Sequence, residues 1–86
     1  MISVKEAVQK AAEYFADLYP DKFPNVLVEE IESKGNDWLI TMGFDDVPDI
    51  FSQLPKRPVR RFKLFTIDAL TGEVKSMRIR EVERVE

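Results

Sequence analysis

The sequence contains no cysteine and no histidine. Without cysteine, the chain has no disulfide framework, no thiolate zinc site and no thiol nucleophile. Without histidine, it lacks the commonest metal ligand and the side chain best suited to act as a general base near neutral pH. These two absences remove most familiar hydrolase and metalloenzyme designs, so we predict no catalytic residue, no metal site and no cofactor.

The sequence also lacks long apolar runs. No stretch reaches the roughly eighteen apolar residues of a membrane-spanning helix, and Met1–Glu6 lacks the apolar stretch of a signal peptide. We therefore expect no membrane span and a soluble, cytoplasmic protein, although a signal peptide removed beforehand would leave the same sequence. The net charge of −3 gives no overall attraction to nucleic acid or to an anionic membrane.

What the sequence does contain is typical of one small globular domain. Its 86 residues leave no room for a second domain, so we expect a single domain over residues 1–86. Hydrophobic residues make up 44% and charged residues 34% of the chain, which is a normal balance for a folded protein. The core should be thin, because chains of this size bury only roughly 60–65% of the surface that they expose when unfolded.

Residues 3–19 have the pattern of an amphipathic helix. Ser3 and Glu6 fit a capping box at its start, and Pro20 prevents its continuation. Apolar residues recur at helical spacing between these limits: Val4, Ala7, Val8, Ala11, Ala12, Phe15 and Leu18. The alanines on this stripe predict a close approach to a flat partner such as a β-sheet.

Four strands are predicted after the helix, at about 25–33, 38–44, 59–68 and 73–83. The second strand alternates, and its apolar side chains share one face: Trp38, Ile40, Met42 and Phe44. That face should receive the helix. The first strand leaves two inward pairs open, either Leu27 with Ile31 or Val26 with Val28.

The last two strands are predicted to form a hairpin. Asp68 can accept backbone hydrogen bonds from residues further along the turn, and Gly72 can take the positive φ that reverses the chain. In the final strand Met77 and Ile79 face inward if the arginines beside them face water. One helix followed by four strands predicts an α+β fold in α-β-β-β-β order. The N-terminal helix packs on one face of a four-stranded antiparallel sheet, and a loop insertion lies near 45–58.

The order of elements and several motifs resemble the PepSY family, whose small α+β modules are related in shape to cystatins. The matching parts are Val4–Val8, the strand pair Val26–Ile31 and Trp38–Phe44, and the turn Ile67–Val74. The turn is similar to that family's recurrent Asp-Ala-x-Thr-Gly-Glu-Val ending. The resemblance implies a non-catalytic module that binds or restrains peptidases or other proteins, often at the cell envelope. Residues 45–60 have no counterpart in the family pattern.

Five cations lie close together in the sequence: Lys56, Arg57, Arg60, Arg61 and Lys63. They can meet phosphate, a carboxylate-rich partner or an acidic peptide. Alternatively, they form a solvated edge defended by charge, or they pair with the nearby aspartates at positions 45, 46 and 49. Nucleic acid is not expected, because the sequence has no recognition-helix pattern and no aromatic RNA-binding strand.

Clustered acids give two further hypotheses. The three aspartates within 45–49 suggest calcium, but they lack the ligand spacing of an EF-hand loop, and helix capping by Asp46 explains them equally well. The three glutamates within 29–32 suggest catalytic carboxylates, but such chemistry needs a cleft that one sheet with one helix hardly offers. We therefore favour solvated acids and predict that the protein is not an enzyme.

A single helix covers one face of the sheet, so the other face should be bare and partly apolar. The simplest assignment places the large aromatic side chains in the core: Trp38, Phe44, Phe51, Phe62 and Phe65. Candidates for the bare face are Leu39, Val26, Val28 and, as the alternative to its place in the core, Phe65. Exposed apolar faces of this kind are usually interfaces. In the insertion, residues 49–54 suggest one helical turn, and its apolar members (Ile50, Phe51 and Leu54) can cover the bare face or anchor a partner.

Together these features predict a non-catalytic protein-binding or regulatory module, with peptidase modulation implied by the family resemblance. The predicted binding residues are Phe51, Leu54, Lys56, Arg57, Arg60, Arg61 and Lys63. The first two serve as anchors, and the cations steer an acidic protein partner. Homodimerisation through an edge strand or the bare face belongs to the same class. The alternative is a small-ligand or anion-binding protein that uses the basic segment 56–63.

Overall fold

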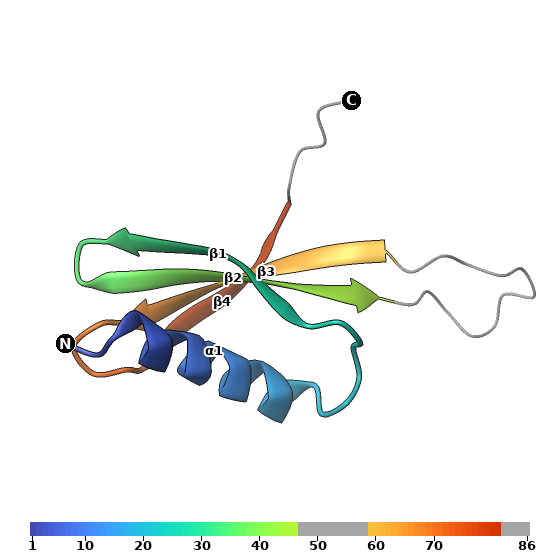
Figure 1. Ribbon diagram of the computed structural model, residues 1–86, viewed down its shortest axis with the longest axis horizontal. Helices are drawn as coiled ribbons and strands as arrows, with labels where there is room; N and C mark the ends of the chain where they lie inside the picture. Colours follow the sequence, from blue (N-terminus) through green and yellow to red (C-terminus); the bar gives the residue numbers. More distant parts are fainter. Residues whose placement is uncertain (47–58, 82–86) are drawn as a thin grey trace, which may run out of the picture.

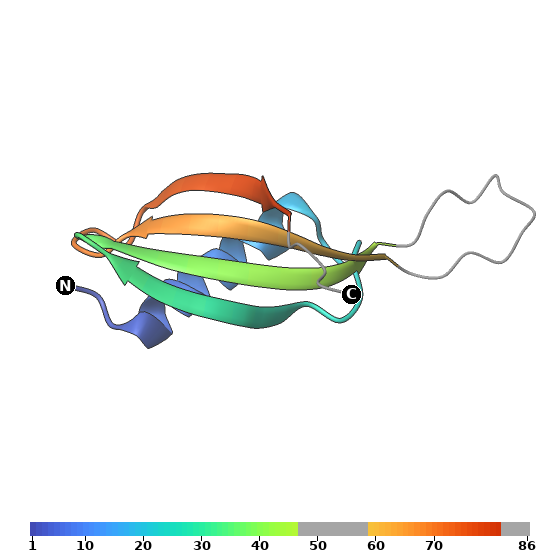
Figure 2. The same ribbon diagram turned by 90° about the horizontal axis from the view of Figure 1, so that it is seen from above.

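The computed structural model describes residues 1–46 and 59–81 and confirms the predicted α+β architecture (Figure 1). Its elements are α1 (Val4–Leu18), β1 (Leu27–Lys34), β2 (Asp37–Asp46), β3 (Val59–Asp68) and β4 (Val74–Arg80). The strands form one sheet in the order β1-β2-β3-β4, and every neighbouring pair is antiparallel. Figure 2, viewed from above, shows the sheet in front and α1 crossing behind it, so the helix covers one face only.

The helix begins and ends where the sequence predicts. The Ser3 hydroxyl oxygen accepts a hydrogen bond from the Glu6 backbone N–H at 3.1 Å, which caps the first turn. Beyond the last helical residue, the Tyr19 N–H donates to the carbonyl of Phe15, and Pro20 follows. Ala7 and Ala11 are fully buried against the sheet, because their small side chains allow the helix backbone to approach closely.

The core lies between α1 and the middle of the sheet. Its buried members are Ala7, Ala11 and Phe15 from the helix, Ile40, Met42 and Phe44 from β2, and Phe65 and Ile67 from β3. The predicted apolar face of β2 therefore receives the helix. Phe15 is central to this packing, with its ring centroid 5.2 Å from that of Phe44 and 6.3 Å from that of Phe65.

The turn between β3 and β4 is built as the sequence predicts. The Asp68 carboxylate accepts hydrogen bonds from the backbone N–H groups of Leu70 and Thr71 at 2.8 and 3.2 Å. Gly72 has a φ of +78° and donates its N–H to the Asp68 carbonyl. The turn also docks against the rest of the fold, since Ala69 accepts a backbone hydrogen bond from Ile2 at 2.7 Å.

The structure decides between the alternatives for several residues of the sheet. Phe65 is fully buried in the core, which confirms its simplest assignment and excludes the bare face, and it pairs there with Ile40 and Met77. Val26 packs against the core rather than on the bare face. Ile79 lies on the helix side as predicted but is 77% exposed, because β4 is an edge strand and its neighbour there is Lys63.

Of the two inward pairs left open for the first strand, Val26 with Val28 lies on the helix side, but Ile31 lies on that side as well. The register of β1 against β2 shifts between Val28 and Glu30, which is a β-bulge. As a result Val28 opposes Met42 and Ile31 opposes Ile40, so both lie on the helix side of the sheet. The bulge breaks the simple alternation on which the prediction relied.

Candidate binding surfaces

The face of the sheet away from α1 carries its own row of apolar side chains. We call it the open face and define it by the residues whose register places them on the side away from the core: Leu27, Glu30, Glu32, Lys34, Asp37, Leu39, Thr41, Gly43, Asp45, Arg60, Phe62, Leu64, Thr66, Asp68, Ser76, Arg78 and Arg80. Leu39, Phe62 and Leu64 are half-buried there, in the two central strands. Leu39 confirms its prediction, whereas Phe62 was expected in the core.

Strand β3 is apolar on both sides, which explains why the open face is not simply polar. Phe65 and Ile67 point into the core, while Phe62 and Leu64 point to the open face. Along a strand, successive side chains alternate between faces. Four apolar residues at these positions therefore supply two surfaces at once.

An arginine from the edge strand β4 lies across the open face. One terminal nitrogen of Arg80 is 2.7 Å from the Glu30 carboxylate of β1 and 2.6 Å from the hydroxyl of Thr41. Thr41 is only 2% exposed, although it is on the face that no helix covers. A hollow of about 210 Å³ adjoins this contact and is lined by Glu32, Leu39, Thr41, Leu64 and Arg80.

A second arginine ties β3 to β1 and to the preceding turn. Arg60 contacts the carboxylates of Glu29 and Asp45 at 2.6 and 3.2 Å and donates to the Asn25 carbonyl at 2.6 Å. Gly43 leaves room for this group, because a Cβ there would lie 2.7 Å from a Glu29 oxygen and 2.9 Å from an Arg60 nitrogen. The glycine therefore lets the ion pair rest against β2.

The electrostatics of this group favour the charged forms. The Asn25 side-chain amide and then the Arg60 guanidinium hold the pKa of Asp45 below its ordinary value. The hydrogen bond to Glu29, followed by that to Asp45, raises the pKa of Arg60. Arg60 is thus held by partners within the chain, which leaves it less available to an outside anion.

A second hollow, of about 500 Å³, lies where β3 extends past the end of β4. It is lined by Phe44, Val59, Arg60, Arg61, Phe62, Lys63, Ile79, Arg80 and Glu81. Three predicted binding residues therefore meet at one place: Arg60, Arg61 and Lys63. The other four (Phe51, Leu54, Lys56 and Arg57) lie outside the described residues, as does the suggested helical turn at 49–54.

The three described cations do not form one basic patch. Arg61 is bound to Asp46 at 2.8 Å, and Lys63 lies on the helix side with its amine 5.7 Å from the Tyr19 ring centroid. Arg60 occupies the other side of the strand with its two carboxylates. The predicted pairing of these cations with Asp45 and Asp46 is confirmed. Position 49 lies outside the residues that the structure describes.

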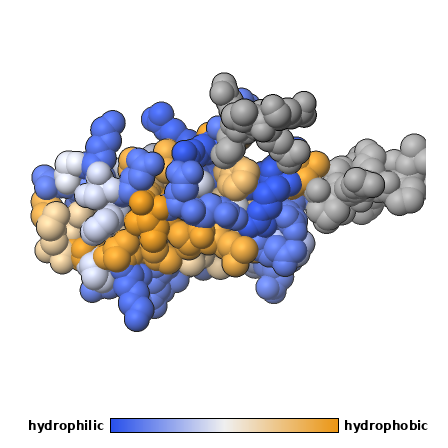
Figure 3. All heavy atoms as spheres, turned by 45° about the horizontal axis from the view of Figure 1, so that its top comes forward, coloured by the Kyte–Doolittle hydropathy of each residue, from blue (hydrophilic) through white to orange (hydrophobic). Residues whose placement is uncertain are grey.

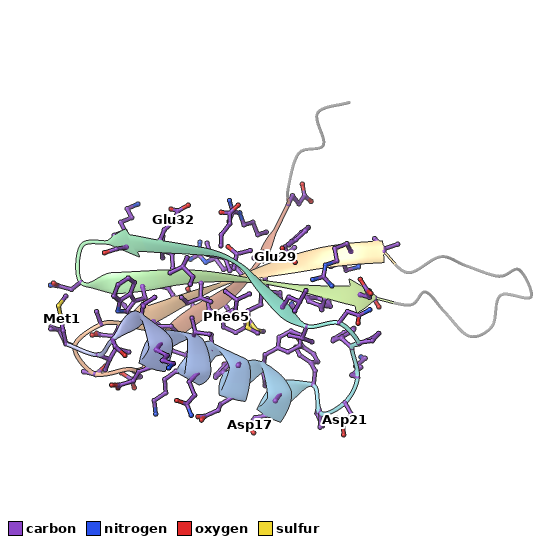
Figure 4. The ribbon with its side chains drawn as sticks, in the orientation of Figure 1. Met1, Asp17, Asp21, Glu29, Glu32 and Phe65 are labelled. Atoms are coloured by element: carbon purple, nitrogen blue, oxygen red, sulfur yellow. The ribbon has the colours of Figure 1, made fainter. Side chains whose placement is uncertain are left out.

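Four of the acidic residues considered for metal or catalysis are engaged in the same contacts. Asp45 and Asp46 bind arginines, and so do Glu29 and Glu30. Within residues 1–46 and 59–81, no three acidic side chains are grouped as they would be around a metal ion. In Figure 4, Glu29 and Glu32 point away from α1, and Phe65 lies between the sheet and the helix.

Strand β1 is the more exposed of the two sheet edges. All its residues are exposed, and α1 packs mainly against β2, β3 and β4. Ile31 and Val28 on its helix side are therefore 46% and 37% exposed. Figure 3 shows one face of the molecule, on which hydrophobic atoms gather in a band with hydrophilic atoms around them.

Sequence reasoning missed the cross-sheet role of Arg80 and the place of Leu64. The second has a signal in the sequence from Phe62 to Ile67, because alternation places Phe62 and Leu64 on one face and Phe65 and Ile67 on the other. Pairs such as Arg80 with Glu30 carry no local signal, because they join residues fifty positions apart.

No family model, curated protein or solved structure matches this chain. Among the described residues, no helix has the length and apolar character that crossing a membrane requires. The interpretation of the surfaces therefore rests on their geometry.

Proposed function

We propose that this chain is a non-catalytic protein-binding module and that its open face is the surface that binds. The observation that carries the proposal is the half-buried row of Leu39, Phe62 and Leu64 on a face without a helix. Apolar groups at the centre of a face, with charges around them, are the usual layout of a protein interface. The PepSY-like assignment, a regulatory role and a cytoplasmic location belong to the same proposal.

The ion pairs of the open face support this use. Arg80 with Glu30 and Arg60 with Glu29 lie beside the apolar row and are already formed in the free protein. A partner that covers the row does not need to desolvate an unpaired charge at these positions. The side chains are also held in place, which lowers the entropy lost on binding.

The test is affinity capture from extract of the source organism, with quantitative comparison of the wild type and the double variant Leu39→Thr/Leu64→Thr. Threonine suits a strand and removes apolar surface at the centre of the open face. We expect the amount of partner captured by the variant to be lower by roughly tenfold or more, because central apolar residues dominate interface energies.

The matched control is the double variant Leu18→Thr/Leu70→Thr, which makes the same substitutions away from the open face. These two leucines are 47% and 60% exposed, on α1 and on the β3–β4 turn. All three proteins must give the same circular dichroism spectrum. Equal capture by the wild type and the open-face variant would contradict the proposal.

A second candidate function, anion binding, is favoured by the 500 Å³ hollow and its four cationic side chains. Arg61 is the best candidate for a ligand contact because its side chain is 58% exposed despite its pair with Asp46. Anion binding predicts a saturable rise in melting temperature with pyrophosphate that is weakened by salt and by Arg61→Gln. No rise in melting temperature would exclude this function for that anion.

A further inference from the structure

The two edges of the sheet are complementary to each other, and we infer from this that the chain associates with further copies of itself head to tail. In this arrangement β4 of one copy pairs with β1 of the next, and the sheet continues from molecule to molecule. The inference goes beyond the proposed function, since it uses the edges of the sheet and leaves free the apolar row of the open face, which is Leu39, Phe62 and Leu64.

Both edges have a regular stretch of the same length. After its bulge, β1 follows β2 without a shift from Glu30 to Lys34. On the other side of the sheet, β4 follows β3 without a shift from Ser76 to Arg80. The directions also agree, because β1 of a second copy placed beside β4 in the same orientation runs antiparallel to it.

The charges of these stretches match in the antiparallel register that places Glu30 opposite Arg80. Glu32 is then opposite Arg78, so that two acid–base pairs form on the open face. Neither Glu32 nor Arg78 takes part in an ion pair within residues 1–46 and 59–81, and both are exposed. Arg80 can exchange its present partner for the Glu30 of the neighbouring copy.

The apolar side chains match in the same register. Ile31 of β1 comes opposite Ile79 of β4, and both are on the helix side of their sheets. In the single chain they are 46% and 77% exposed. Association of the two edges therefore buries Ile79, the most exposed isoleucine of the described residues, and this supplies the apolar part of the contact.

Like edges do not fit each other in this way. A twofold pairing of two β1 strands centred on Ile31 places Glu30 opposite Glu32 twice. The corresponding pairing of two β4 strands centred on Ile79 places Arg78 opposite Arg80 twice. Like charges directly opposite destabilise a strand pair. Two β1 edges or two β4 edges therefore repel each other, whereas a β1 edge and a β4 edge attract each other. This difference distinguishes the proposal from a twofold dimer.

The proposal has a consequence for assembly size. A head-to-tail contact leaves one free β1 and one free β4 at the ends of every dimer, so association continues to trimers and larger species until a ring closes. It also weakens with salt, because it depends on exposed charges.

The experiment is sedimentation velocity from micromolar to millimolar protein, at low salt and at about 0.5 M salt. For the wild type we expect the average mass to pass that of a dimer at low salt and to fall at high salt. Glu32→Lys and Arg78→Glu should each weaken association roughly tenfold, since each turns an attractive pair into a repulsive one. Ile79→Ser should weaken it as well.

Mixing the two charge variants gives the sharpest result. An equal mixture of Glu32→Lys and Arg78→Glu should associate again, because every contact between unlike chains has an acid opposite a base. Glu13→Lys is the matched control, with the same charge change on the exposed surface of α1. Each variant must melt like the wild type, which is expected because the substituted side chains are exposed.

Four results would overturn the inference. They are a wild type that stays monomeric at low salt, a mass that stops at a dimer, a Glu13→Lys effect equal to that of Glu32→Lys, and a mixture that does not associate. None of these results tests the apolar row of the open face, so capture of a partner through Leu39 and Leu64 is decided by its own experiment.

Discussion

At the scale of single residues, Asp68 is the side chain that fixes the β3–β4 turn. Its carboxylate accepts two backbone hydrogen bonds, while its own N–H and carbonyl bond Glu73 and Gly72. The hydrogen bond from Leu70 and then that from Thr71 hold the pKa of Asp68 below the ordinary value of 3.8. The folded state therefore prefers the ionised carboxyl group.

This preference predicts a pH dependence of stability with a definite sign. Because the pKa of Asp68 is lower in the folded state, its contribution is complete above the ordinary value and is lost as the pH falls through the folded pKa. Asp68→Asn keeps an oxygen acceptor but does not titrate. We expect acid unfolding curves of this variant to fall less steeply below about pH 4 than those of the wild type.

Thr71→Ala serves as the control, because it leaves the carboxylate and both of its N–H donors in place. It should lower the melting temperature at every pH and keep the wild-type slope. A carboxyl carbon titration of Asp68 by NMR that gave a midpoint at or above 3.8 would contradict the argument.

The helix cap at Ser3 gives a second prediction at this scale. Removing its hydroxyl in Ser3→Ala leaves the Glu6 N–H without that partner, and we expect a loss of about 1 kcal/mol in the free energy of unfolding. Urea denaturation followed by circular dichroism measures it. Ser33→Ala, at an exposed position of β1, should change stability by less than about 0.5 kcal/mol. Equal losses in the two variants would show that the cap is not the cause.

At the scale of elements, α1 holds the sheet through few but closely packed side chains. Phe15 is 3% exposed and contacts four other aromatic rings. Phe15→Ala should therefore lower the free energy of unfolding by about 3–4 kcal/mol, which is typical of a buried aromatic ring. Leu18→Ala, on the same helix but 47% exposed, should cost less than about 1 kcal/mol in the same urea titration. Similar losses of stability in the two variants would contradict this packing of the helix on the sheet.

The elements themselves could be predicted well from the sequence because their signals are local. Ser3 and Pro20 bound the helix, the alternation from Trp38 to Phe44 defines the inner face of β2, and Asp68 with Gly72 defines the last turn. Each signal is contained within a few residues and follows from hydrogen bonding or side-chain alternation.

The faces of the outer strands could not be predicted, because they depend on register. The bulge at Glu29 reverses the alternation of β1, and nothing in its sequence marks that position. The placement of α1 over β2 to β4 decides how far Ile31 and Ile79 are exposed. Long-range pairs such as Arg60 with Glu29 depend on the same register, so the candidate surfaces emerged only with the fold.

At the scale of the whole molecule, one helix and one sheet form two layers, and the helix covers only one face of the sheet. The helix side contains the core, and the open face presents an apolar row held between ion pairs. The edges add acidic and basic strands at opposite sides of the same sheet. Binding of a partner through the apolar row and association of copies through the edge strands can therefore depend on different residues of one small domain.

The central claim is that the open face binds another protein, and site-specific photocrosslinking in cells of the source organism tests it most directly. A photoreactive amino acid replaces Leu64 in one version and Leu70, on the exposed turn, in the other. The account predicts an adduct of defined mass from position 64 that is absent from position 70. The same adducts from both positions, or none from position 64, would contradict it.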